Sequence, residues 1–123
     1  MIRLALAMLM TGLTACQAQT VAATVWQLAQ IDGTPYSANA TLTIAPDSRV
    51  SGRAPCNSYA GGSGAQYPAF DARRLRATKR ACPSLRAETA YFQALAAMQT
   101  AKRDGDRLIL RGDGRQMVFT ASE

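Results

Sequence analysis

Two cysteines frame the stretch of the chain that carries most of its reactive side chains. Cys56 opens the run Cys-Asn-Ser-Tyr, and Cys82 closes the run Thr-Lys-Arg-Ala-Cys. Such a pair can form a disulfide in an oxidising compartment or act as a redox couple. The redox alternative is disfavoured, because the spacing is not Cys-x-x-Cys and no thioredoxin-like strand–helix–strand pattern surrounds it. The state of the two thiols therefore depends on where the protein resides.

A serine and a lysine in this stretch are the candidates for catalysis. Ser58 and Tyr59 could join Lys79 in a Ser-Lys nucleophilic site if the fold brings them together. The alternative is that Asn57, Ser58 and Tyr59 shape the loop and bond to backbone groups. The chain has no histidine, which removes His-based triads and most zinc sites, and its eight acidic residues are scattered. The sequence therefore predicts neither an enzyme nor a cofactor or metal site.

Positive charge is the third chemical feature. The net charge of +6 and the pI near 9.8 favour anionic partners. If residues 73–80 form a strand, Arg74, Arg76 and Arg80 project from one face. Such a row repels itself, so we expect it to contact anionic lipid, lipopolysaccharide or an acidic envelope protein. The alternative is an ordinary solvated face.

The N-terminal segment predicts where in the cell the protein resides. A basic start, an apolar run that is too short to span a membrane, and small residues make residues 1–15 a secretory signal. The segment Leu-Thr-Ala-Cys that ends at Cys16 resembles the bacterial lipobox, in which cleavage leaves the Cys as a lipidated first residue. The alternative is an ordinary signal peptide with an incidental Cys. By the same resemblance, Gln17 rather than Asp favours the outer membrane. This address predicts a membrane anchor at Cys16 and disfavours nucleic acid as a partner.

Removing the signal has two consequences for the mature chain. It takes away Arg3 and lowers the net charge from +6 to +5. It also leaves Cys56 and Cys82 as an even pair in an oxidising compartment, which predicts a disulfide worth about 3 kcal/mol. After the lipidated Cys, residues 17–23 form a small polar tether that reaches about 25 Å at most when extended.

The elements that position these residues are mostly short strands joined by tight turns, as in an antiparallel sheet. In the first strand, Trp26 and Leu28 share the inward face. The glycines of residues 60–64 form a loop that lacks the pattern of a phosphate-binding loop. The strands are expected at 24–31, 40–45, 49–52, 66–71, 73–80, 107–111 and 116–120, with a hairpin turn at 112–114.

One helix is expected. Ser84 is a candidate N-cap, and Glu88 lies where the helix dipole favours a carboxylate. Lys102 and Arg103 suit the helix C-terminus, and residues 104–105 end the helix. Four residues at helical spacing form its apolar core face: Tyr91, Phe92, Leu95 and Met98.

The chain carries in order Trp26 with Leu28, then Gly33, then Gly52, then the Cys-Asn-Ser-Tyr run with Gly61, and then the Thr-Lys-Arg-Ala-Cys run. Together these motifs resemble the META domain, the family of the heat-inducible HslJ-like lipoproteins, over nearly all of the mature chain. The sequence departs from the family at residues 54–55, where Gly usually adjoins the Cys, and at 79–80, where Arg-Met is more usual. The resemblance implies an α+β fold, with a small, partly curled and barrel-like antiparallel sheet packed on one main helix. It also implies paired cysteines, but no established activity, cofactor or catalytic residue. The motif residues are Trp26, Leu28, Gly33, Gly52, Asn57, Ser58, Tyr59, Gly61 and Thr78, along with Cys56 and Cys82.

These observations lead to one expected function and one alternative. The chain is expected to be a non-enzymatic, lipid-anchored envelope protein in which residues 24–123 form a META-like module facing the periplasm. The family is loosely associated with envelope stress, so a binding or accessory role there is part of the expectation. The alternative is a small inhibitor or chaperone of an envelope enzyme, which would have to be acidic because a +5 domain repels basic targets.

Overall fold

The computed structural model describes residues 24–62 and 65–122. The expected signal peptide, Cys16 and the tether lie outside these residues. Within them no helix has the length and apolar character needed to cross a membrane. The described elements are β1 (Val25–Ile31), β2 (Thr34–Pro35), β3 (Thr41–Ile44), β4 (Val50–Arg53), β5 (Ser58–Gly61), β6 (Arg76–Ala77), α1 (Leu85–Ala97), β7 (Thr100–Asp104), β8 (Arg107–Gly112) and β9 (Arg115–Ser122).

The strands form one antiparallel sheet. Its order is β6-β5-β4-β3-β1-β9-β8-β7, and β2 pairs with β1 outside this path. The end strands β6 and β7 are not paired with each other in the described part of the chain, so the sheet is open. The α+β class with one helix is confirmed, whereas the barrel-like curl expected from the family resemblance is wrong. Strands of two to eight residues hold the sheet together without closing it.

Alternation of side chains decides which face of each central strand enters the core. Trp26 and Leu28 are buried in β1, and Leu42 and Ile44 are buried in β3, as their period of two predicts. The pairing of β1 with β9 shifts by one residue after Leu28, which marks a bulge in β1.

Two tight turns fix the C-terminal meander. Gly114 has φ +71° and joins β8 to β9, so the expected hairpin is confirmed. Gly105 has φ +60° and joins β7 to β8. Glycine adopts this left-handed region without the steric cost that a Cβ adds.

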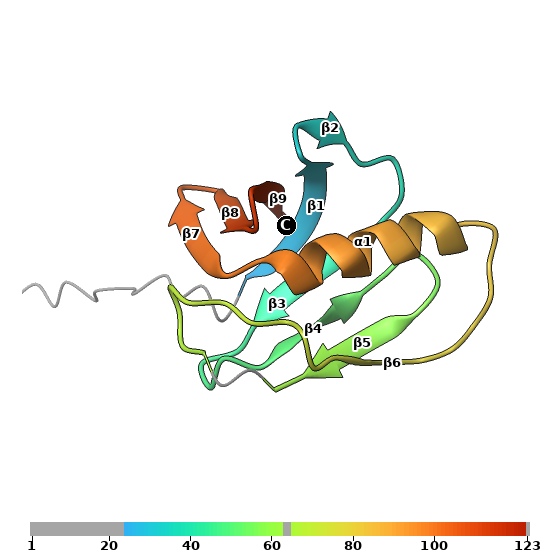
Figure 1. Cartoon of the computed structure of the whole chain (residues 1–123), viewed down its shortest axis with the longest axis horizontal. Helices are drawn as coiled ribbons and strands as arrows, with labels where there is room; N and C mark the ends of the chain where they lie inside the picture. The colour runs from blue at the N-terminus through green and yellow to red at the C-terminus, as the bar shows by residue number, and fades with distance from the viewer. Residues whose placement is uncertain (1–23, 63–64, 123) are drawn as a thin grey trace, which may run out of the picture.

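Helix α1 lies across one face of the sheet, in front of β1 and β3 in Figure 1. Tyr91, Leu95 and Met98 of its expected apolar face are buried, and Phe92 is partly buried against the same core. Ser84 occupies the N-cap position, but its side chain makes no capping hydrogen bond. The expected core face of the helix is therefore confirmed, and the expected cap interaction is not found.

The helix is shorter than the sequence suggests. Met98 has φ −72° and ψ 138°, an extended conformation that ends α1 before the expected basic C-terminus. Lys102 and Arg103 lie instead in β7, in which Ala101 points into the core. Because a small alanine is the buried residue between exposed polar ones, the strand carries little hydrophobic signal.

Two expected strands are also corrected. Residues 66–71 form a loop beside β7, where the Ala101 amide donates to the Pro68 carbonyl at 2.8 Å. Pro68 has no amide hydrogen to contribute to a ladder. Residues 73–80 contain only the two-residue strand β6. Part of the glycine-rich segment expected as a loop belongs to β5, which pairs with both β4 and β6.

Candidate functional site

The disulfide ties the start of β5 to the segment that leads into α1. Cys56 and Cys82 are bonded, with 5.6 Å between their Cα atoms, as the sequence predicts. Both residues are partly buried. The bond joins residues that are 26 positions apart and holds the Cys-Asn-Ser-Tyr run against the Thr-Lys-Arg-Ala-Cys run.

Asn57 fills the space between these two runs. Its Oδ1 accepts from the Arg80 amide at 2.6 Å and from the Thr78 hydroxyl at 2.9 Å. Its Nδ2 donates to the Arg80 carbonyl at 3.0 Å and to Glu88 Oε2 at 2.8 Å. These contacts use both donors and both acceptor positions of the side-chain amide. Asn57 therefore acts as a structural clamp in this fold.

Glu88 supplies a buried carboxylate to the same cluster. Only 5% of the residue is exposed, and its Oε1 accepts from the amides of Cys56 at 3.1 Å and Asn57 at 2.9 Å. A buried carboxylate is tolerated when several donors replace its hydration. The sequence predicts only that Glu88 interacts with the helix dipole, and this role in the cluster was not predicted. Its spacing of three from Tyr91 and seven from Leu95 places it on the buried helix face, and this was the available signal.

A tyrosine cluster continues the network under α1. The Tyr59 hydroxyl donates to the Thr41 carbonyl and lies 2.5 Å from the Tyr91 hydroxyl. The Tyr36 hydroxyl donates to the Ala87 carbonyl at 2.8 Å. Burial raises the pKa of Tyr36 to about 12, and it also raises the pKa values of Tyr59 and Tyr91. All three phenols are therefore neutral hydrogen-bonding groups at ordinary pH.

Three further motif residues are buried, lie in a tight turn or lie in close contact with a neighbouring strand. Trp26 is fully buried, and the Arg103 guanidinium carbon lies 5.3 Å from the centre of its ring. Gly33 has φ +78° in the turn between β1 and β2. Gly52 lies so close to β3 that a Cβ would collide with the Thr41 carbonyl and the Tyr59 hydroxyl.

The candidate Ser-Lys site is not assembled as a hydrogen-bonded pair. The Ser58 amide donates to the Thr78 hydroxyl at 3.2 Å, and the Thr78 amide donates to the Ser58 carbonyl at 3.0 Å. Ser58 and Lys79 are both exposed, and the described residues include no hydrogen bond between them. The Ser58 backbone thus helps to join the two runs, which matches the structural alternative for this residue.

The predicted arginine row divides into two groups. Arg74 and Arg76 line a hollow of about 560 Å³ together with Arg49. Arg80 lines a separate hollow of about 300 Å³ together with Arg53. The row is broken because β6 covers two residues, so the period of two does not extend from 74 to 80. All five side chains belong to exposed residues.

Neutralisation of these arginines is limited. Arg49 forms a long ion pair with Asp47, with 3.8 Å between Nε and Oδ2. In the described ranges, the ion pairs leave out Arg53, Arg74, Arg76 and Arg80. The neighbouring Asp71 is bound by Arg73, whose hydrogen bonds lower the Asp71 pKa to about 2. Both hollows are thus positively charged.

The comparisons with known proteins agree with this architecture. A META domain profile matches residues 19–123. The chain belongs to the META domain family. Its structure resembles the NMR structure of a protein from Burkholderia xenovorans, with a TM-score of 0.63, 26% identity and coverage of 80% of this chain and 81% of that one.

A second protein solved by NMR shares the META fold of this chain. The TM-score is 0.59 and the identity is 16%, with coverage of 79% of this chain and 87% of that chain. At this identity the likeness concerns the fold alone. No functionally curated protein matches the chain significantly.

Proposed function

We propose that this META domain protein is a lipid-anchored envelope protein that faces the periplasm and works by binding rather than by catalysis. Cys16 is the proposed lipidated residue, and the outer membrane is the proposed site of anchoring. The predicted signal peptide and the resemblance of the segment ending at Cys16 to a lipobox support this location. The disulfide between Cys56 and Cys82 is consistent with it, because disulfides persist in oxidising compartments.

One observation supports a binding role: the polar groups of the family motif are already hydrogen-bonded within the domain. Asn57 bonds to Arg80, Thr78 and Glu88, and the Tyr59 hydroxyl bonds to Thr41 and Tyr91. These side chains stabilise the folded domain, and their hydrogen-bonding groups are used in internal contacts, so they are not free to act on a substrate. At the β4–β6 end of the sheet, exposed arginines remain available to an external molecule.

The exposed arginines indicate the chemistry of the binding partner. Arg53, Arg74, Arg76 and Arg80 lie on neighbouring segments at the β4–β6 end of the sheet. Exposed guanidinium groups bind phosphate and carboxylate groups through paired hydrogen bonds. The proposed partners are anionic lipid, lipopolysaccharide or an acidic envelope protein, and a role in envelope stress is part of the proposal.

Capture from native envelopes tests this function. The lipidated protein is tagged at its C-terminus, cross-linked in intact cells and purified, and the co-purifying lipids and proteins are identified. The control is a triple variant in which Arg74, Arg76 and Arg80 are changed to Gln. An anionic molecule enriched with the wild type and lost from the variant supports the proposal. Equal recovery by both proteins contradicts the role of the arginines.

The same experiment tests the alternative function, a small inhibitor or chaperone of an acidic envelope enzyme. The outward-facing residues between the arginines are small, namely Ser51, Ser58 and Ala60. No large side chain among them blocks the approach of a protein. Recovery of one acidic enzyme in stoichiometric amount would favour this alternative over lipid binding.

A further inference from the structure

The point at which the chain enters the domain lies at the same end of the sheet as the larger basic hollow. In the antiparallel register of β1 and β3, Trp26 pairs with Leu42 and Gln27 with Thr41, so the same register brings residue 24 level with Ile44. Ile44 in turn pairs with Val50, and Val50 pairs with Gly61. Figure 1 agrees, since the start of β1 and the turn between β3 and β4 lie on one side of the view.

The larger hollow is built on this level of the sheet. Val50 and Gly61 line it, and Arg49, Arg74 and Arg76 surround it. Neighbouring strands lie about 4.8 Å apart, so Val50 is roughly 10 Å across the sheet from residue 24. The hollow thus lies close to the base of the proposed seven-residue tether.

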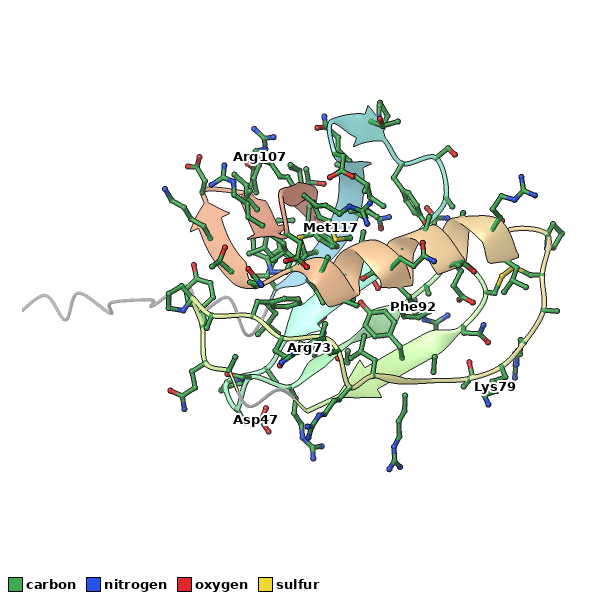
Figure 2. All side chains as sticks on the ribbon, viewed as in Figure 1. Asp47, Arg73, Lys79, Phe92, Arg107 and Met117 are labelled. Atoms are coloured by element: carbon green, nitrogen blue, oxygen red, sulfur yellow. A yellow bond between two sulfur atoms is a disulfide. The ribbon has the colours of Figure 1, made fainter. Side chains whose placement is uncertain are left out.

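The smaller hollow lies at the other end of the same strands. Arg53 pairs with Ser58 at the far end of β4, roughly 10 Å from Val50 by the rise per residue. Arg80 and the disulfide adjoin that end. Figure 2 illustrates the separation, with Asp47 labelled near the first end and Lys79 near the second. The two ends therefore differ in their distance from the chain entry while both carry arginines.

The shape and charge of the larger hollow suit a phosphate group. Small residues, Ser51 and Ala60 among them, line this recess of about 560 Å³ together with the three arginines. No acidic residue is among the described residues that line it. Arginine forms bidentate hydrogen bonds with phosphate, and a basic residue close to an anionic leaflet gains attraction that salt screens.

We propose that the hollow of Arg49, Arg74 and Arg76 binds anionic phospholipid headgroups of the membrane that anchors the chain, so that the domain stands with this end of its sheet on the leaflet. The proposal rests on the proposed lipid anchor at Cys16. It assigns different surroundings to the two basic hollows. The larger one faces the membrane, and the one lined by Arg53 and Arg80 faces away from it.

Paramagnetic relaxation in nanodiscs tests this orientation. The mature, lipidated protein is placed in discs of phosphatidylethanolamine and phosphatidylglycerol that contain a gadolinium-chelating lipid. The amide signals of Gly61 and Ser58, at the two ends of β5, are then compared. We expect several-fold greater relaxation enhancement at Gly61, because the effect falls steeply with distance. Equal enhancement at the two ends, or a greater effect at Ser58, overturns the proposal.

Two variants with the same loss of charge supply the control. The double change Arg74→Gln and Arg76→Gln should remove most of the difference between the ends, and the change Arg53→Gln with Arg80→Gln should preserve it. The exposed positions leave the fold intact, which the amide spectra check directly. Loss of the difference in both variants would mean that net charge, and not this hollow, sets the orientation, and would overturn the proposal.

Two further outcomes separate this proposal from its alternatives. If the mature protein carries no lipid and does not remain with the disc, the proposed function fails and the orientation fails with it. If the protein is anchored but shows no preferred end, the orientation fails alone. Glycerol phosphate added at constant ionic strength should leave the pattern unchanged, whereas loss of the pattern would reassign the hollow to soluble phosphate esters and overturn the headgroup assignment.

Discussion

Glu88 of α1 accepts two hydrogen bonds from the Asn57 residue that precedes β5. One comes from the backbone amide at 2.9 Å and the other from the side-chain amide at 2.8 Å. The two residues are 31 positions apart in the sequence, and both are buried. This contact joins α1 to the disulfide-bonded loop. The helix therefore helps to hold the Cys-Asn-Ser-Tyr run, the most specific motif of the family, in place.

Changing Glu88 to Gln should destabilise the protein although the side-chain size is retained. A carboxylate offers acceptors at both oxygens, whereas a Gln must direct its NH₂ group at either the backbone amides or Asn57 Nδ2. A buried donor without an acceptor costs about 2 kcal/mol. Urea unfolding measures the change, with Gln93→Ala on the exposed side of α1 as the control. Wild-type stability in Glu88→Gln would contradict the hydrogen bonds between Glu88 and Asn57.

The close approach at Gly52 predicts a matched pair of glycine variants. In Gly52→Ala the new Cβ collides with the Thr41 carbonyl and the Tyr59 hydroxyl, so the strands must move apart at a cost of about 2 kcal/mol. At Gly62 the Cβ would meet open space, so Gly62→Ala should change the stability little. Thermal unfolding of the two proteins compares them. Similar melting temperatures would mean that β3 and β4 are not packed as described.

Alkaline pH should unfold the domain through its tyrosines. Burial raises the pKa values of Tyr36, Tyr59 and Tyr91 above 10, so the unfolded chain releases these protons before the folded one does. Their contribution to stability is complete below pH 10 and is lost as the pH rises through 10 towards 12. Urea unfolding at stepwise pH measures the decline, and Tyr36→Phe should make it shallower. A free energy of unfolding that stays constant over this range would contradict the burial.

The sequence patterns predicted the parts of the fold in which apolar side chains repeat clearly. Trp26 and Leu28 in β1, the β8–β9 hairpin and the Tyr91–Leu95 face of α1 follow from such repeats. β7 could not be recognised, because its buried residue is the small Ala101 and its flanking charges are typical of a helix end. A local pattern cannot separate these two cases, since the pairing with β8 decides between them.

The polar contacts of the site were less accessible to sequence analysis. The pairing of Cys56 with Cys82 followed from counting cysteines in an oxidising compartment. The partnership of Asn57 with Glu88 depends on how the helix docks over the loop, which no local pattern reports. The division of the arginines into two hollows depends on the shortness of β6, where the backbone leaves the sheet after Ala77. Contacts between distant segments thus account for what the sequence left undetermined.

The disulfide should contribute measurably to stability. Closing a loop between residues 26 positions apart is worth about 3 kcal/mol under the chain-entropy model. Cys56→Ser with Cys82→Ser should lower the free energy of unfolding by this amount, and mass analysis of the native protein without reduction should detect no free thiol at either position. Two alkylated thiols in material from the periplasm would contradict the pairing in the cell.

Lipid labelling of Cys16 tests whether the protein is anchored in a membrane. Cells that produce the wild type or Cys16→Ser are labelled with a palmitate analogue, and their membranes are fractionated. We predict a labelled, processed wild type in the outer membrane fraction, and a variant that carries no label. An unlabelled wild type in the soluble fraction, or a Cys16→Ser protein that is labelled and fractionates like the wild type, would contradict the lipid-anchored account.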